Sequence, residues 1–202
     1  MLKRSVQPEL LDSLSGDDPE ALRSRRDLRL INHLMGNERW MARQAGDGSI
    51  VELGAGSGDL TRKLLRTHQV TALDFQGRPE GLECPWVKGD LFETLDGVPG
   101  RTVLANLILH HFSDVQLSEL GELIRSRKML VAVEPWRSRL ALAEGYLMWP
   151  LINRVTRHDM MVSIRAGFRK GELEGLLGLG EGWSWRESVS LRGGLRIIAE
   201  KR

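Results

Sequence analysis

The sequence predicts an α/β protein in which a mostly parallel sheet carries helices on both faces. Two patterns carry this prediction. After residue 48, short apolar runs alternate with helical patterns, as expected for parallel strands that are joined by crossover helices. Near the C-terminus, two strand-like runs flank Arg192-Gly193-Gly194, which favours a tight hairpin. The chain is therefore expected to close with two antiparallel strands.

The composition of the chain fits one globular domain with a small appendage. Its 202 residues are 41% hydrophobic and 28% charged, with a net charge of +2, so a sizeable core is available. A single cysteine, Cys84, excludes an intramolecular disulfide framework and a cysteine-based zinc site. The longest apolar tract, 140–152, contains Glu144 and Pro150 and is too short for a membrane span. No apolar run follows the basic N-terminus, so we expect a cytoplasmic protein without a signal peptide.

The first 45 residues differ from the rest and are predicted to form a helical cap, 1–45, beside a main domain of residues 46–202. Asp17-Asp18-Pro19-Glu20 is typical of a helix start, because it combines a capping residue, an early proline and acidic charge. A helix is predicted over residues 21–35, and Gly36-Asn37 is expected to end it. A second short helix is predicted over residues 38–44.

The first predicted helix is rich in arginine. It carries Arg23, Arg25, Arg26 and Arg29. The pattern fits a solvated face around a leucine stripe. It also fits a surface that steers an anionic substrate or contacts an RNA backbone. Few aromatic residues accompany the arginines and the sequence contains no recognisable RNA-binding module, so nucleic acid is not the expected partner.

The main domain is predicted to contain five parallel strands before the closing hairpin. The candidate strands are residues 49–53, 70–73, 86–88, 103–109 and 129–133. The helical patterns cover residues 60–67, 113–127, 137–149 and 170–177. Ser113 is a candidate helix cap, and Glu134-Pro135 is expected to end the fifth strand. The hairpin strands are predicted over residues 183–190 and 195–200.

The most informative motif is a glycine-rich turn between the first strand and the helix that follows it. It reads Val51-Glu52-Leu53-Gly54-Ala55-Gly56-Ser57-Gly58-Asp59-Leu60. Glycines allow a positive φ and let a ligand approach the backbone closely. The third glycine comes one residue earlier than in the dinucleotide fingerprint, and the Gly-Lys-Ser/Thr of a phosphate loop is missing. Glu52 would repel a diphosphate and suits a ligand with a positively charged ammonium group.

A second feature of the same edge is an acidic residue at the end of the second strand. Asp74 follows Gly54 by twenty residues, a spacing at which a carboxylate accepts the hydroxyls of a ribose. Phe75 comes next and can lie against an adenine ring. The two features together describe a nucleoside with a cationic tail that carries no phosphate. S-adenosylmethionine (SAM) matches this description.

The segment Val51–Leu60 resembles motif I of the class I SAM-dependent methyltransferases, and further motifs follow in order over residues 46–200. Thr71–Asp74 is similar to the second motif, with the ribose-binding acid. Lys88–Leu91 resembles the third, in which Asp90 would meet the adenine amine and Leu91 would pack on the ring. Residues 105–112 and 131–135 are similar to the next two, and Asn106 and Leu107 would line the methionine end of the cofactor.

The resemblance implies a Rossmann-like sheet of seven strands whose last strand is antiparallel. It also implies that Gly54, Ala55, Gly56 and Gly58 contact SAM. One departure is the span Gln76–Gly81, which is poor in helix-forming residues. The helix that the family has between the second and third strands is therefore expected to be reduced or absent.

Three histidines are candidates for proton removal from a methyl acceptor. His110 and His111 end the fourth predicted strand, where strand alternation would place them on opposite faces, so that one of them faces the site. His158 lies in the predicted connection before the last helix, in the segment 158–168, which resembles small bacterial methyltransferases of secondary metabolism. We assign the base role to His111 or His158, since an imidazole titrates near neutral pH. The alternative for each is a structural, hydrogen-bonded histidine, and no metal site is expected.

The leading hypothesis is a SAM-dependent methyltransferase that acts on a small apolar or aromatic molecule, with methylation of oxygen favoured. An RNA or protein methyltransferase is one alternative, although the Asn-Pro-Pro-aromatic type of motif is missing at Asn106-Leu107. A catalytically silent SAM-binding scaffold is another. A dehydrogenase is disfavoured by the glycine spacing. No membrane contact is expected, and the sequence is compatible with a homodimer.

Overall fold

The computed structural model describes residues 2–202, in which seven strands form one mixed sheet of order β3-β2-β1-β4-β5-β7-β6. The strands are β1 (Ser49–Leu53), β2 (Gln69–Asp74), β3 (Trp86–Lys88), β4 (Thr102–Asn106), β5 (Met129–Pro135), β6 (Trp183–Val189) and β7 (Gly194–Lys201). The pairs from β3 to β5 are parallel, and β7 is antiparallel to β5 and to β6. The predicted α/β sheet of seven strands with an antiparallel last strand is confirmed.

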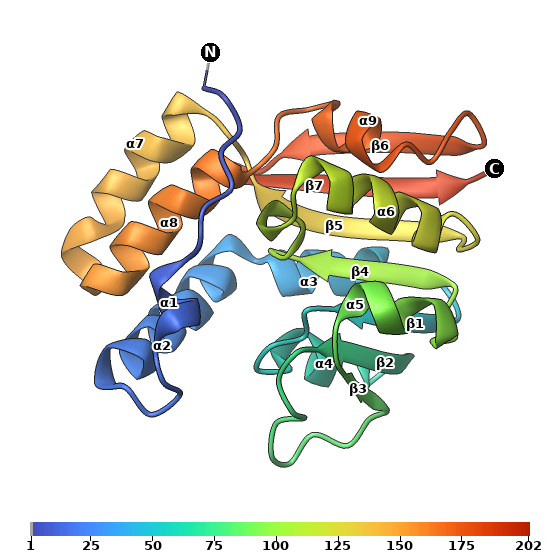
Figure 1. Cartoon of the computed structure of the whole chain (residues 1–202), viewed down its shortest axis with the longest axis horizontal. Helices are drawn as coiled ribbons and strands as arrows, with labels where there is room; N and C mark the ends of the chain where they lie inside the picture. The colour runs from blue at the N-terminus through green and yellow to red at the C-terminus, as the bar shows by residue number, and fades with distance from the viewer. Residues whose placement is uncertain (1) are drawn as a thin grey trace.

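The helices lie on both faces of this sheet and beyond its carboxyl edge (Figure 1). They are α1 (Leu10–Ser13), α2 (Pro19–Met35), α3 (Asn37–Gln44), α4 (Asp59–Leu64), α5 (Leu91–Thr94), α6 (Asp114–Ile124), α7 (Arg139–Met148), α8 (Arg154–Ala166) and α9 (Glu172–Leu177). Short 3-10 turns are η1 (Leu95–Gly97), η2 (Leu109–His111) and η3 (Trp149–Leu151). Helices α1, α2, α7 and α8 gather where the parallel strands end, which is the edge at which such sheets bind ligands.

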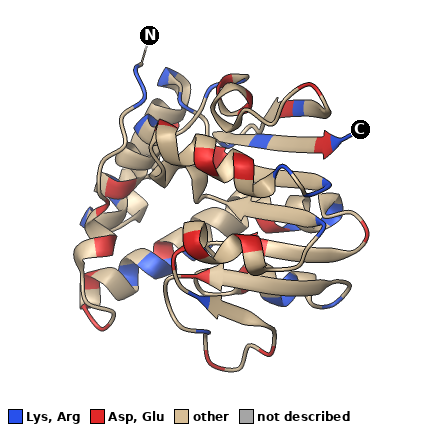
Figure 2. Cartoon of the chain, turned by 45° about the vertical axis from the view of Figure 1, so that its right-hand side comes forward, with Lys and Arg blue, Asp and Glu red and all other residues tan. Residues whose placement is uncertain are grey.

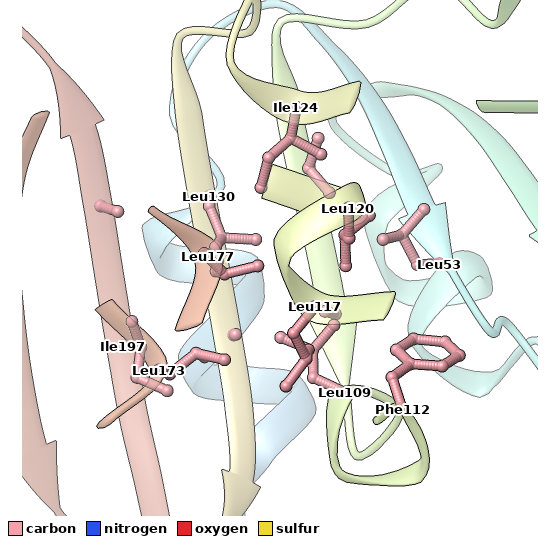
Figure 3. Packing of buried hydrophobic residues seen from close by; sticks show 14 of the residues in the cluster. Leu53, Leu109, Phe112, Leu117, Leu120, Ile124, Leu130, Leu173, Leu177 and Ile197 are labelled. Atoms are coloured by element: carbon pink, nitrogen blue, oxygen red, sulfur yellow. The ribbon is translucent and has the colours of Figure 1, made fainter. Parts of the chain in front are cut away.

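One hydrophobic core fills the space between the sheet and helices α5, α6 and α9. Leu120 and Ile124 of α6 share this core with Leu173 and Leu177 of α9, and Leu120 lies on the side toward Leu53 (Figure 3). At Gly121, an added Cβ would lie 1.8 Å from the Leu177 carbonyl oxygen, so only glycine lets the two helices approach this closely. This close packing buries one face of the sheet beneath α5, α6 and α9.

A second core fills the opposite face, between the sheet and helices α3 and α4. Its buried members are Met41, Ala45, Ile50, Leu60, Leu64, Val70, Leu104, Val131 and Val133. Strand alternation explains the division, because neighbouring residues of β1 such as Ile50 and Val51 enter different cores. Figure 2 shows that acidic and basic residues lie mainly on helices and loops, which leaves the centre of the sheet apolar.

The predicted cap is tied to the rest of the molecule in two ways. Helix α3 packs on the sheet through Met41 and Ala45, whereas α2 packs on α8 through the buried Ser24 hydroxyl, which accepts a hydrogen bond from Thr156 at 2.9 Å. The cap boundary at residue 45 stays a prediction, and its first residue, Met1, lies outside the described residues. No helix within residues 2–202 is both long and apolar enough to cross a membrane.

Three differences from the predicted elements concern the carboxyl edge. Strand β4 ends at Asn106 instead of Leu109, because Leu107 turns to a φ of 57° and the chain enters η2. Helix α8 was expected to be a connection; the Asn153 side chain accepts the Thr156 N–H and starts a new helix there. Helices α1 and α5 were not predicted, and at four residues each they carry little periodic signal. As expected, no helix joins β2 to β3 within the described chain.

Candidate functional site

The glycine-rich turn joins β1 to α4 and requires glycine at two positions for steric reasons. Gly54, Gly56 and Gly58 all adopt a positive φ, between 53° and 73°. A Cβ on Gly54 would lie 2.8 Å from Cγ1 of Ile108, and one on Gly58 would lie 2.7 Å from Cδ2 of Leu82. A Cβ on Gly56 would meet no atom within 4 Å, so this part of the turn faces open space. A ligand can therefore approach the backbone at Gly56.

Asp74 lies beside this turn, at the end of β2. Its carboxylate accepts the Gly56 N–H at 2.7 Å and the Gln76 N–H at 2.8 Å. Each oxygen therefore accepts one hydrogen bond from the backbone and keeps further acceptor capacity for a ligand hydroxyl. Phe75 follows with its side chain 66% exposed, which leaves a ring face free for stacking. Ala55 is buried and donates its N–H to the Leu73 carbonyl, which ties the turn to β2.

Glu52 lies beneath the turn instead of in open contact with its surface. The side chain is buried and accepts a hydrogen bond from Thr61 Oγ1 of α4 at 2.7 Å. Burial raises the pKa of Glu52 to about 8, although the hydrogen bond from Thr61 opposes this effect. The carboxyl group is therefore mostly protonated at neutral pH, and a nearby ligand cation would favour its ionised form.

This pKa predicts that replacement of Glu52 by glutamine removes a pH dependence of stability. Between pH 4.5 and about 8, the folded chain keeps a proton on Glu52 that the unfolded chain has released, so stability falls as the pH rises through this window. Relative to the variant, the wild type should lose about 3–5 kcal/mol between pH 5 and pH 8.5. Urea unfolding at the two pH values measures the difference, and an equal gap at both values would contradict the assignment.

Asn106 and Leu107 end β4 next to the turn. The Asn106 side-chain oxygen Oδ1 is buried and has no hydrogen-bond partner among the described residues. A buried amide oxygen of this kind is rare and indicates a missing donor. Leu107 has a positive φ of 57°, which is strained for a residue with a side chain. Its N–H donates to the Val133 carbonyl at 2.8 Å, and this bond holds the strained turn in place.

Asp90 and Leu91 start helix α5, and both have structural contacts. Asp90 caps the helix, since one carboxylate oxygen accepts the Phe92 N–H at 2.8 Å. Leu91 is buried in the core between the sheet and α6. The other carboxylate oxygen of Asp90 has no hydrogen-bond partner among the described residues, so it is available to a ligand donor. The proposed adenine contacts of these two residues therefore stay predictions.

A buried carboxylate organises the end of β4. Glu134 of β5 is fully buried and accepts the N–H groups of Ile108, Leu109 and His110 at 3.1, 2.8 and 3.2 Å. It also contacts Nδ1 of the His110 ring at 2.7 Å. The Glu134 side chain therefore provides the acceptor for the backbone N–H groups at the start of η2. The sequence analysis predicted a strand end at this place.

His110 and His111 do not lie on opposite faces, because they belong to η2 and not to a strand. Their rings are 4.3 Å apart, centre to centre. Burial opposes a charge on His110, but Glu134 and Glu9 outweigh it and raise its pKa to about 9. Burial and the neighbouring His110 lower the pKa of His111. Sequence reasoning missed Glu9, which comes from the N-terminus and lies 3.8 Å from Nε2 of His110.

The N-terminal strap, residues 2–13, places Glu9 over this cluster and crosses the carboxyl edge of the sheet (Figure 1). Arg4 donates to the Phe112 carbonyl at 2.7 Å and to the Ala166 carbonyl at 2.9 Å. Asp159 of α8 accepts the N–H groups of Leu10 and Leu11 at 2.7 and 3.0 Å. The strap therefore acts as a cover that is hydrogen-bonded at both ends.

His158 lies on α8, outside the cluster around His110. Its side chain is 46% exposed, and Nδ1 lies 2.9 Å from Oδ1 of Asp159. This contact orients the ring, and Nε2 makes no hydrogen bond or ion pair within residues 2–202. A histidine held by a carboxylate in this way has the arrangement of a general base.

No protein-family model matches the chain, and no curated protein matches it. Several solved structures do. The pyocyanin biosynthetic protein PhzM is similar to 92% of this chain, with a TM-score of 0.65 and 22% sequence identity. The match covers only 60% of the length of PhzM. The plantazolicin methyltransferase BamL, in complex with a triazolic desmethylPZN analog and SAH, gives 0.69 at 14% identity over 95% and 92% of the two chains.

Human N-acetylserotonin methyltransferase, in complex with SAM, gives a TM-score of 0.61 at 17% identity over 94% of this chain and 61% of that protein. These three structures share with the chain an α/β architecture, and the identities are low enough that the likeness concerns the fold. The seven strands, their order and the antiparallel β7 agree with it. The chain has the class I methyltransferase fold.

Proposed function

We propose that the protein is a SAM-dependent methyltransferase that acts on a small molecule, with transfer to an oxygen atom favoured. The observation that carries this proposal is the unpartnered Oδ1 of Asn106 beside an open glycine turn. A SAM ammonium group offers the donor that this oxygen lacks. Asp74, which accepts the Gly56 N–H of this turn, can accept further hydrogen bonds from ribose hydroxyls. The residues present therefore fit the cofactor that the fold implies.

When bound, SAM would supply a methyl group on a positively charged sulfur, and this sulfur would leave as S-adenosylhomocysteine (SAH) as the methyl carbon bonds to an oxygen of the acceptor. The chain contributes position and surroundings for this step. Gly54, Gly56 and Gly58 would let the cofactor lie against the backbone, and Asp74 and Asn106 would hold its two ends. The N-terminal strap and α8 lie across the neighbouring carboxyl edge, where they would cover a bound acceptor and exclude water. The names of the structural neighbours support a small or peptide-derived acceptor, and an apolar or aromatic one stays our proposal.

The direct test is calorimetric titration of the purified protein with SAM, with SAH and with NADH as the control. We expect both sulfur compounds to bind with micromolar affinity and NADH not to bind. The protein must first be shown to carry no bound cofactor from expression. Binding of NADH alone, or of none of the three, would overturn the proposal.

Methyl transfer to a hydroxyl requires a proton acceptor, and His111 and His158 are our candidates. His158 has the more accessible ring, oriented by Asp159. Replacement of His158 by alanine should lower turnover at least about tenfold while cofactor affinity is unchanged, because general bases contribute this much or more. The control is His33→Ala, which removes an exposed histidine of α2 that is distant in sequence from His158 and should leave turnover unchanged. Equal turnover in wild type and His158→Ala would remove His158 from the mechanism.

A further inference from the structure

A cluster of metal-binding side chains lies at the carboxyl end of β4, beside the cofactor edge. It consists of Glu9 from the N-terminal strap and of His110 and His111 from η2. We propose that this cluster, named the His-His-Glu cluster below, binds a divalent first-row transition metal ion. The proposal rests on the proposed function only for the role of the ion, and the site itself stands on geometry.

The three side chains can offer ligand atoms to one point in space. One imidazole nitrogen from each histidine and one carboxylate oxygen all lie within 4.8 Å of one another. Around a metal with bonds of about 2.0–2.2 Å, ligand atoms lie roughly 3–3.5 Å apart. At its widest the cluster would therefore contract by at most roughly 1.3–1.8 Å, a change that small rotations of the Glu9 and His111 side chains can supply.

The surroundings of the cluster match those of metal-bound histidines. His110 is buried, and its Nδ1 contacts the Glu134 carboxylate at 2.7 Å, while Nε2 faces Glu9. A ligating imidazole usually makes such a contact through its other nitrogen, and the contact fixes the ring. Glu134 in turn holds the backbone of η2 through three N–H groups. The carboxylate behind His110 therefore fixes this ligand before an ion arrives.

The third ligand is also held in place from outside the cluster. Ser163 of α8 donates a short hydrogen bond to Oε1 of Glu9. The strap on either side is fixed by Arg4 and by the bonds from Leu10 and Leu11 to Asp159. Three elements that are distant in sequence, the strap, η2 and α8, therefore meet at this point.

The ligand set favours one class of ion. Two imidazole nitrogens and one carboxylate oxygen suit zinc, cobalt(II) and iron(II), whereas magnesium and calcium prefer oxygen ligands. Three protein ligands leave at least one coordination position open. If the proposed function holds, this position would take an oxygen of the methyl acceptor and orient it toward the cofactor edge. The class of acceptor would then be a molecule with a hydroxyl or carbonyl oxygen able to bind a metal ion.

The test uses full-length protein that has been dialysed against a chelator and then titrated with Zn²⁺ in a calorimeter. We expect one equivalent to bind, and we expect Co²⁺ to give visible absorption bands of a protein site with nitrogen ligands. Glu9→Gln and His111→Ala should each weaken Zn²⁺ binding at least tenfold, and His111→Ala should remove the cobalt bands. His33→Ala, which removes an exposed histidine of α2, should bind Zn²⁺ like the wild type.

Glu9→Gln serves as the variant that keeps the protein folded, because it preserves the size of a strap side chain. At the same Zn²⁺ concentration, its unfolding temperature should rise clearly less than that of the wild type. Equal Zn²⁺ affinity in wild type, Glu9→Gln and His111→Ala would overturn the metal site, as would the absence of any bound ion. Titration of the same samples with SAM separates the two proposals, since a wild type that binds SAM but no Zn²⁺ rejects this site alone.

Discussion

Replacement of Glu134 by alanine is expected to lower the free energy of unfolding by about 3–5 kcal/mol, the cost of removing one partner from a buried charged pair. Glu134 is fully buried and accepts three backbone N–H groups as well as contacting His110. Alanine leaves all of these groups buried without a partner. Urea unfolding followed by circular dichroism measures the loss.

Two further variants make this prediction specific. Glu134→Gln keeps one acceptor oxygen and should lose clearly less stability than Glu134→Ala. Glu122→Ala removes a glutamate whose side chain is 61% exposed and forms an ion pair with Arg125, so it should cost no more than about 1 kcal/mol. A loss in Glu134→Ala no greater than in Glu122→Ala would show that Glu134 does not organise the end of β4.

Replacement of Asp74 by alanine should weaken SAM binding by roughly 10- to 150-fold. A hydrogen bond to a charged group contributes about 1.5–3 kcal/mol, which corresponds to this range. Asp74 also holds the turn through the Gly56 N–H, so part of the effect is loss of preorganisation. Calorimetric titration of wild type and variant with SAM measures the change.

A cofactor analogue that lacks the ribose hydroxyls distinguishes direct contact from support of the turn. The wild type should bind this analogue more weakly than SAM, and Asp74→Ala should bind both compounds equally. If the variant still discriminated against the analogue as strongly as the wild type, the ribose hydroxyls would be bound elsewhere. Asp74→Asn, which keeps one acceptor oxygen, should bind SAM with an affinity between those of the wild type and Asp74→Ala.

Much of the fold could be predicted because its signals are local. The strands 49–53 and 86–88 were predicted with the bounds that the structure has, since buried parallel strands are apolar runs between breakers. The Gly54–Gly58 turn was predicted from residue type, since a positive φ selects glycine. Helix α8 was missed because its start depends on the Asn153 side chain, and a cap of this kind is a weak signal inside an irregular stretch.

Part of the candidate site could also be predicted from local signals, and part could not. Asp74, Asn106 and the glycine turn follow from their places at strand ends, since the carboxyl ends of parallel strands meet at one edge. The pair His110 and His111 was noted in the sequence but assigned to opposite faces, because a strand was assumed where Leu107 turns the chain into η2. The backbone angle at one residue decided where both rings point.

The sequence by itself determined the fold class, the glycine-rich turn and the edge of the sheet at which Asp74 lies, because apolar periodicity, glycine and strand-end acids act over a few residues. Only the tertiary structure decided which groups meet at the end of β4. Glu9, His110 and Glu134 are separated by about a hundred residues and by twenty-four residues along the chain. No local pattern links them, since their contact results from the path of the N-terminal strap across the edge and from the pairing of β4 with β5.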